Sequence, residues 1–264
     1  MKQYNPQLLI PFVEKMIKDG QLHRTLYTYM PIDLLDERVK PVFEDCKLWF
    51  SSPANFNDPF DCKIYPHIPT DDELAKYLAT HAENASPDDY NIIREGIQKF
   101  GSGLAKQAID DVMNKSGVKC FTPNNANILM WSHYANSHRG ICLEFDTLID
   151  PEFFVYPINV VYSKEYPNLE FTDKQFTTEV LRTKSKDWEY EREVRVYKIG
   201  HGYYFFNPES LRSITFGCNT PEDKQSQIIE IIRRNKYLDH VHFFKCKTSS
   251  KEFKLEIEAL IDKE

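Results

Sequence analysis

The sequence predicts an α+β fold with a central, mostly antiparallel and strongly aromatic sheet, flanking helices and a helical insertion. Two observations support this prediction. Runs of strand-like segments have helices set between them, without the regular strand–helix–strand period of an α/β protein. Aromatic residues make up 14% of the 264 residues, with 18 Phe and 15 Tyr, which suits a sheet-rich core or the lining of a cleft.

The composition favours one domain over residues 1–264. The apolar share of 41%, the charged share of 28% and the counts of 9 Gly and 15 Pro are typical of a globular protein. The length allows one sizeable core or two small ones, and no repeat, low-complexity tract or change in composition marks a linker. We therefore expect a single domain in which residues 70–117 are the helical insertion.

The charge and hydropathy indicate a cytoplasmic protein. A net charge of -7 and a pI near 5.7 argue against extended binding to duplex nucleic acid, because that mode needs a broad basic surface. A local basic cleft stays open as an alternative. No run approaches the roughly 20 apolar residues that span a bilayer, and the first residues lack a secretory signal, so we expect no membrane partner.

The cysteines are expected to be reduced thiols. They are scattered singly, without the paired spacing of thiolate zinc sites or redox motifs, and nothing indicates the export that a disulfide set would imply. The six are Cys46, Cys62, Cys120, Cys142, Cys218 and Cys246.

The first predicted elements lie before residue 62. Residues 7–18 have the spacing of a short amphipathic helix, and residues 25–29 form a predicted strand rich in β-forming side chains. A second strand is expected at 47–51. It runs into a stretch dense in Pro, Asn and Asp, which favours a defined loop over a helix.

The segment 70–117 has a helical pattern. Thr70 and Ser86 each precede acidic residues, as capping hydroxyls do before a first helical turn, and Pro87 suits the first helical position. The tripeptide Gly101-Ser102-Gly103 is expected to break the long helix. The segment could be a lid or a solvated excursion, and we favour an insertion without catalytic content.

Most of the sheet is expected after residue 119. A helix is predicted around residues 127–137, and another begins at Thr220. The predicted strands lie near residues 140–146, 155–163, 193–199, 202–206, 212–217, 241–243 and 253–257.

The loop from Asn55 to Asp61 is the first candidate site. It holds two amides, two carboxylates and two aromatic rings within seven residues. Asn and Asp side chains can cap their own backbone while the Phe rings anchor the loop in the core, which is an architectural interpretation. The functional alternative is a rigid loop that presents Asn57 or Asp58 to a ligand.

The segment MWSHYANSHRG is the second candidate. We expect a helix that ends at Gly140 in a left-handed cap. Trp131, Tyr134 and His138 would share one face, which suits core packing or the wall of an aromatic pocket. His133 and His138 are five residues apart, which does not fit the i, i+4 pair of a zinc site, so no metal is predicted. Tyr134 as a stacking platform for a planar ring is the sharper hypothesis.

The segment WEYEREVRV is the third candidate. A strand here would place Glu189, Glu191, Glu193 and Arg195 on one face. Neighbouring carboxylates repel, so they persist on a solvated face or because a site needs them together. We favour the solvated face. In a cleft, Glu191 or Glu193 could bind ribose hydroxyls or stabilise an oxocarbenium-like centre.

Motifs of several large enzyme classes are absent from the sequence. There is no GxSxG, P-loop, HExxH or GxGxxG. Walker-type hydrolysis, elbow-serine hydrolysis, this kind of zinc chemistry and dinucleotide-fold hydride transfer therefore have no support.

Four blocks together resemble the bacterial domain-of-unknown-function family 2971, over about residues 26–217. The resemblance lies in an opening LYTY strand, a strand leading into FNDPF, the MWSHYA block through EF, and a late W-x-Y-E-x-E-V-R segment. In this sequence the blocks are Leu26–Tyr29, Leu48–Asp61, Met130–Phe145 and Trp188–Arg195. The family name implies no activity.

The layout is also similar to the ADP-ribosyltransferase superfamily, with an early strand, a second strand bearing Ser or Tyr, and a late Glu-x-Glu. This resemblance implies that the candidate residues gather around NAD as a substrate. Met30 stands where the family more often carries Arg, which leaves Arg24 or His23 as substitutes for a pyrophosphate or ribose contact. The substrate-binding candidates are Tyr29, Ser51, Asn57, Asp58, Trp131, His133, His138 and Arg195, and the catalytic candidates are Tyr134, Glu191 and Glu193.

The first functional hypothesis is NAD-dependent ADP-ribosyl transfer in bacterial defence or stress response, to a macromolecular acceptor that the sequence does not identify. Tyr134 would stack on nicotinamide while Glu191 or Glu193 stabilises the ribosyl cation. This hypothesis requires Ser51, Tyr134 and one glutamate to meet in one pocket.

Two alternatives stay open. A non-catalytic binding or sensor protein would bury Asp58, His133 and Glu191 in a network with Arg195 and leave no open cavity. A metal-dependent nuclease would gather four carboxylates. Those four are Asp58, Asp61, Glu144 and Glu191.

Overall fold

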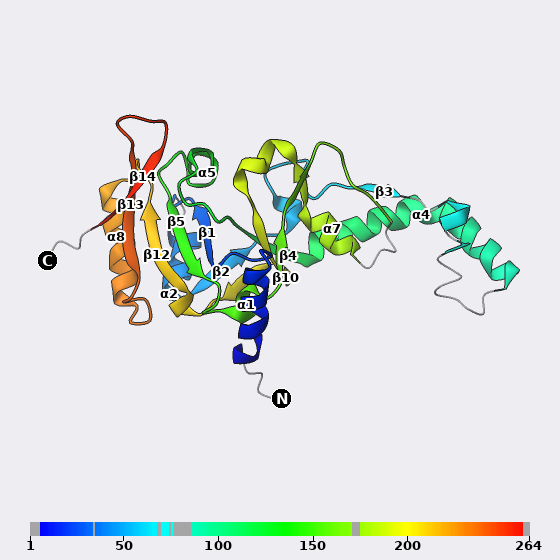
Figure 1. The fold of residues 1–264 in the computed structure, drawn as a ribbon, viewed down its shortest axis with the longest axis horizontal. Coiled ribbons are helices and arrows are strands. Elements are labelled where there is room, and N and C mark those ends of the chain that lie inside the picture. The colour runs from blue at the N-terminus through cyan, green and yellow to red at the C-terminus, as the bar shows by residue number, and fades with distance from the viewer. Residues whose placement is uncertain are drawn as a thin grey trace.

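The computed structural model describes residues 6–33, 35–67, 70–73, 75–76, 86–170 and 175–260. The α+β prediction is confirmed: a five-stranded sheet, a three-stranded sheet and several short strand pairs are interleaved with helices (Figure 1).

The larger sheet has the strand order β1-β5-β12-β13-β14. Its pairs are antiparallel except for β12 and β13, which are parallel and are connected through helix α8 (Glu222–Arg234). The five strands are β1 (Thr25–Met30), β5 (Ile141–Asp146), β12 (Leu211–Phe216), β13 (His242–Thr248) and β14 (Leu255–Ala259).

The smaller sheet is antiparallel and has the order β4-β10-β6. Its strands are β4 (Ser116–Phe121), β10 (Val194–Ile199) and β6 (Pro157–Asn159). A separate antiparallel pair joins β2 (Lys47–Phe50) to β11 (Gly202–Phe205). Two very short parallel pairs, β3 (Tyr65–His67) with β8 (Asn168–Glu170) and β7 (Val161–Ser163) with β9 (Thr183–Ser185), complete the described strands.

Two isolated bridges attach the first strands to β4. Tyr27 of β1 exchanges backbone hydrogen bonds with Thr122, and Ser51, just after β2, exchanges them with Val118. Residues an even number apart use the same edge of a strand, so both contacts lie on one edge of β4. The interval of β4 between these two points is the backbone of the candidate site.

The remaining described helical elements are mostly short. They are η1 (Pro6–Leu9), α1 (Ile10–Lys18), the π-helix η2 (Leu35–Val39), α2 (Lys40–Glu44), η3 (Pro53–Asn55), α4 (Pro87–Lys115), α5 (Ile128–Tyr134), α6 (Pro151–Phe154), α7 (Phe176–Arg182), η4 (Lys186–Glu191) and η5 (Pro208–Ser210). Among the described residues, none of the helices is at once long and apolar enough to traverse a bilayer.

The main core is aromatic, as the composition predicted. Phe145 of the larger sheet meets Phe121 of β4 and Phe206 edge to face, with ring centroids 6.0 and 5.2 Å apart. Phe153 and Phe154 of α6 join the same cluster. Burying each such ring contributes about 1.5–3 kcal/mol relative to exposure, so this cluster joins the two sheets firmly.

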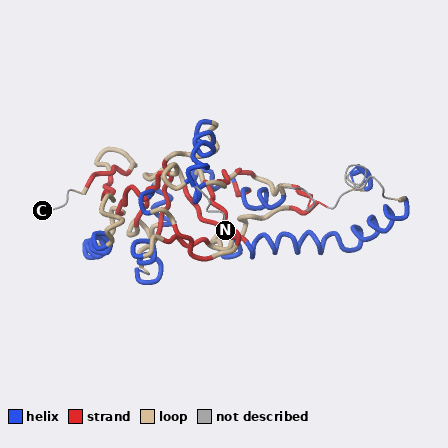
Figure 2. The backbone as a smooth tube through the Cα atoms, turned by 90° about the horizontal axis from the view of Figure 1, so that it is seen from below, coloured by secondary structure: helices blue, strands red, loops and turns tan. Residues whose placement is uncertain are grey.

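Helix α4 leaves the body of the molecule as a long arm (Figures 1 and 2). Ser86 and Asp89 form a reciprocal capping box at its start, as the sequence predicted for Ser86. The expected break at Gly101-Ser102-Gly103 is wrong, because the helix is continuous through it. A glycine weakens a helix by only about 1 kcal/mol relative to alanine. Residues 77–85 of the predicted insertion lie outside the described residues.

Candidate functional site

A cleft of about 990 Å³ lies where β1, β2 and β4 approach one another. Its walls also include α5, the loop after β2 and the segment η2. Pockets for drug-sized ligands measure about 300–1,000 Å³, so this cleft is at the upper end of the range for ligand pockets.

The cleft brings together seven of the eleven predicted site residues. They are Tyr29, Ser51, Asn57, His133, Tyr134, Glu191 and Glu193. Four predicted residues do not line it: Asp58, Trp131, His138 and Arg195.

A group of buried charged residues, which we call the buried charge network, lies at the floor of the cleft and directly behind it. It consists of Asp61, Lys184, Glu191, Glu193 and Arg195, all at most 6% exposed. The Lys184 amine donates to Glu191 Oε2 at 2.6 Å and to Glu193 Oε2 at 3.0 Å, and it lies 3.7 Å from Asp61 Oδ2. Lys184 therefore joins all three carboxylates.

Arg195 supports this group from below. It donates from Nη2 to both oxygens of Asp61, at 2.8 and 2.7 Å, and from Nε to Glu193 Oε1 at 2.8 Å. Its Nη1 donates to the backbone oxygen of Leu181 at 2.7 Å. Because Arg195 is fully buried behind the carboxylates, it positions them and does not meet a ligand.

The two glutamates differ in their tendency to hold a proton. Burial raises the pKa of Glu191; the Lys184 charge offsets this only in part, and the neighbouring Glu193 charge adds to the rise. Burial also acts on Glu193, but the charges of Arg195 and Lys184 outweigh it and hold its pKa well below the usual range. Glu193 is therefore ionised, while Glu191 is the carboxyl of the pair that is more readily protonated.

The network's backbone departs from the sequence prediction. Residues 186–191 form the helix η4, Arg192 is left-handed with φ of 47°, and β10 begins only at Val194. The expected continuous strand and its solvated face are thus wrong, since Glu191, Glu193 and Arg195 are 2%, 4% and 0% exposed. The turn at Arg192 nevertheless returns both glutamates to one side, where Lys184 joins them.

Tyr134 forms the wall above Glu191. Its hydroxyl donates to Glu191 Oε1 at 2.6 Å, which fixes the ring next to the carboxyl. Burial raises the pKa of Tyr134, so the hydroxyl is a neutral donor. Asn127 caps the start of α5 and also donates to the backbone oxygen of Tyr190 at 2.9 Å, which holds α5 against η4. His133 adds a 3.0 Å contact with the Tyr190 hydroxyl.

The segment that carries most of these residues matches a family model. Residues 130–196 match the family model "Protein of unknown function (DUF2971)". The resemblance to family 2971 is supported over this DUF2971 segment, and the resemblance to ADP-ribosyltransferases has no support from the comparisons. No curated protein and no solved structure matches the chain significantly.

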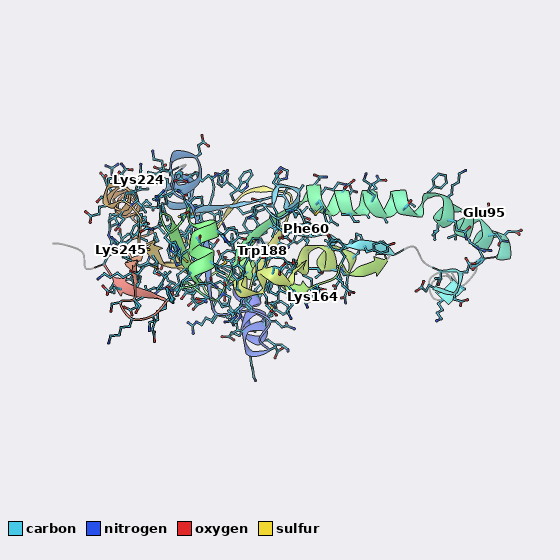
Figure 3. The ribbon with its side chains drawn as sticks, turned by 90° about the horizontal axis from the view of Figure 1, so that it is seen from above. Phe60, Glu95, Lys164, Trp188, Lys224 and Lys245 are labelled. Atoms are coloured by element: carbon cyan, nitrogen blue, oxygen red, sulfur yellow. The ribbon has the colours of Figure 1, made fainter. Side chains whose placement is uncertain are left out.

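The DUF2971 segment supplies most of the network and one wall. It contains Tyr134, Lys184, Glu191, Glu193 and Arg195, whereas Asp61 comes from the loop before it. In Figure 3, Trp188 of this segment lies in the body of the molecule, and Glu95 lies far along the arm. The part of the chain that matches the family thus supplies four of the five residues of the buried charge network.

Two further predicted residues of the DUF2971 segment do not line the cleft. Trp131 is fully buried, donates to the Asn125 oxygen at 2.8 Å and packs edge to face on Tyr29 at 5.1 Å. Helix α5 ends at Tyr134, so His138 does not continue its face as expected. His138 itself is left-handed with φ of 66°, and burial lowers its pKa.

The predicted left-handed cap at Gly140 is also wrong. The left-handed residues are the three from Asn136 to His138. Gly140 is required for a different reason, because a Cβ there would lie 2.3 Å from the Met30 backbone oxygen.

Asp58 lies beside the cleft without lining it. Its Oδ1 accepts the backbone N–H of Phe60 at 2.8 Å, which is the architectural role considered for this loop. Its Oδ2 is buried and has no hydrogen-bond partner among the described residues. Arg24, a suggested phosphate contact, instead pairs with Asp146 at 3.3 Å, and His23 does not line the cleft either.

The four carboxylates of the nuclease hypothesis are not gathered. Asp61 and Glu191 both face Lys184, but Glu144 accepts from Ser213 at 2.5 Å within the larger sheet. Within the described ranges, no group of three or more His, Cys, Asp or Glu side chains is arranged to hold a metal ion.

Sequence reasoning missed several residues of the cleft. Lys184 lies in a segment without a motif, although the excess of carboxylates nearby called for a buried cation. Cys120 is exposed and lines the cleft. All six cysteines are free thiols.

Proposed function

We propose that the cleft binds NAD and catalyses transfer of its ADP-ribosyl group to an acceptor. The observation that carries the proposal is the meeting of Ser51, Tyr134 and Glu191 in one cleft, with Tyr134 hydrogen-bonded to Glu191 at 2.6 Å. This is the arrangement that the transferase hypothesis required.

In the proposed reaction, the bond between the nicotinamide nitrogen and ribose C1′ breaks, and its electron pair leaves with neutral nicotinamide. The positive charge that develops on the ribosyl group is stabilised by the Glu191 carboxylate, which Lys184 and Tyr134 hold in place. The acceptor nucleophile then bonds to C1′ and releases its proton to water. Tyr134 offers a ring of fixed orientation on which nicotinamide can stack.

Glu193 has a supporting role in this scheme. Its carboxylate is bound by Arg195 and Lys184, which hold it in the ionised state. It therefore fixes the position of Lys184 and, through it, that of Glu191. We assign the electrostatic role to Glu191 and the positioning role to Glu193.

One observation favours a second candidate, a ligand-binding protein without catalysis. Both oxygens of Glu191 already accept hydrogen bonds, and the side chain is only 2% exposed. On this hypothesis the network is scaffold and the cleft holds a nucleotide without cleaving it. The network differs from the one expected for a binding protein, since Asp61 replaces Asp58 and the cleft is open.

The test is incubation of the purified protein with labelled NAD, with nicotinamide release and label transfer to lysate proteins and nucleic acids as readouts. Glu191→Gln keeps the shape of the side chain and removes its charge, so release should fall by about 100-fold or more. Glu189→Gln, an exposed glutamate of the same helix η4, is the matched control and should leave the rate unchanged. The double variant Glu191→Gln, Glu193→Gln should be as inactive as the first.

The outcomes separate the two candidates. Release that depends on Glu191 supports the transferase. NAD binding measured by calorimetry without nicotinamide release supports the binding protein. If the protein shows no NAD binding and no release, both candidates are overturned.

A further inference from the structure

Two aromatic side chains of the cleft have no part in the proposed reaction. Trp49 of β2 and Tyr203 of β11 are direct cross-strand partners, with ring centroids 5.0 Å apart and an angle of 72° between their planes. Both line the cleft, yet they are 45% and 41% exposed. Aromatic rings with this much exposure in a pocket are available to a ligand.

Trp49 is not required by the core. In β2 the neighbouring Leu48 and Phe50 point inward and are buried, whereas Trp49 lies on the opposite face. Within the described chain, its ring contacts are with Tyr203 and, at 6.5 Å, with His201, the residue just before β11. The side chain can therefore be removed without opening a cavity in the core.

Tyr203 is also bonded to the segment η2, which carries a cation. Its hydroxyl donates to the backbone oxygen of Glu37 in η2 at 2.8 Å. The next residue, Arg38, is exposed and lines the cleft, and no described carboxylate pairs with it. The same part of the cleft thus offers two rings and a guanidinium, which suits phosphate groups next to a planar base.

We propose that Trp49 and Tyr203 stack on the second ring of a dinucleotide, with Arg38 contacting its phosphates, while the reacting ring lies on Tyr134. This inference rests on the proposed function of the cleft as an NAD site and deepens it, because it assigns the adenine end of the substrate. A volume of about 990 Å³ is at the upper end for ligand pockets, which fits a dinucleotide better than a mononucleotide.

The ladder provides a matched control. Phe205 lies two residues after Tyr203, so its side chain is on the same face of β11, and it is 64% exposed. It does not line the cleft. Phe205→Ala therefore removes an exposed aromatic ring of the same ladder outside the proposed site.

The experiment is calorimetric titration of wild type, Trp49→Ala and Phe205→Ala with NAD, ADP-ribose and nicotinamide mononucleotide. When an aromatic side chain that stacks on a base is replaced by alanine, affinity for the ligand typically falls by roughly 10- to 100-fold. We expect that loss in Trp49→Ala for NAD and ADP-ribose, which carry adenine, and no loss for the mononucleotide. Phe205→Ala should bind all three as wild type does. Circular dichroism of each variant verifies that the fold is intact.

The results also distinguish this inference from the proposed function. Nicotinamide release with unchanged NAD affinity in Trp49→Ala, or an equal loss in Phe205→Ala, overturns the inference and leaves the transferase standing. ADP-ribose binding that depends on Trp49, without any release from NAD, supports the inference and overturns the transferase. If wild type binds none of the three ligands, both proposals fail.

Discussion

The aromatic core and the buried charge network both lie inside the protein, but their burial has opposite effects on the free energy of folding. The core around Phe145 contains apolar side chains that gain free energy simply by leaving water. The network buries three carboxylates and two cations, whose removal from water opposes folding and is offset only by their mutual attraction. A protein that needed stability alone could fill this space with apolar residues, so the network points to a use beyond folding.

Removal of one network cation should give the largest effect, matched by removal of one core ring. Arg195→Met removes one of the two cations that pair with buried Asp61 and Glu193, and we expect the free energy of unfolding to fall by about 3–5 kcal/mol. This equals the loss of about 3–5 kcal/mol expected for Phe145→Ala in the core. Denaturant titration of both variants measures it. The exposed Arg139→Met should stay within about 0.5 kcal/mol of wild type. A loss in Arg195→Met no larger than this control would mean that water reaches the network.

The dependence of stability on pH should separate the two regions further. The pKa of Glu193 is lowered in the folded state, so its contribution is present above its ordinary pKa of about 4.5 and is lost as pH falls below that value. The pKa of Glu191 is raised, so its ionisation in the folded state weakens stability as pH rises above about 4.5. The two residues thus act with opposite sign.

Denaturant titrations between about pH 3.5 and about pH 7, on both sides of the ordinary glutamate pKa of about 4.5, measure this contrast. The destabilisation caused by Glu193→Gln should be greatest at neutral pH and shrink towards pH 3.5. The free energy of unfolding of Glu191→Gln should instead increase relative to that of wild type as pH rises. Phe145→Ala should show the same deficit throughout, because no titratable group is removed. Parallel curves for the two glutamine variants would contradict the different pKa directions of the glutamates.

The same contrast explains what the sequence could and could not predict. Alternation of apolar residues located the longer strands well, including 25–29, 140–146 and 212–217. It failed for the three-residue strands, such as β6 and β7, which were predicted as one strand. Three residues are too few to show an alternating pattern. The run of carboxylates singled out the glutamates of the network as a candidate site, but the period-two pattern favoured a solvated face over a cleft, which was wrong. Lys184 was missed because its pairing is tertiary and leaves no local pattern.

The smallest effect on stability is expected in the arm α4, where the same glycine-to-alanine change can be compared with one next to the cleft. A Cβ added at Gly103 would meet no described atom within 4 Å, so Gly103→Ala should stabilise the helix by about 0.5–1 kcal/mol through helix propensity alone. Gly140→Ala makes the same chemical change next to the cleft, where the Cβ would lie 2.3 Å from the Met30 oxygen and 2.9 Å from Ala135 Cα. Both contacts are with backbone, which cannot move aside cheaply.

Thermal unfolding followed by circular dichroism should therefore show a small rise in Tm for Gly103→Ala and a clear fall for Gly140→Ala. Nicotinamide release should be unchanged in the first, since the arm does not line the cleft. It should fall in the second, because Gly140 packs against Met30 of β1, which lines the cleft, and against the turn that follows Tyr134. A loss of release in Gly103→Ala would instead give the arm a part in the reaction, against the expectation of an insertion without catalytic content.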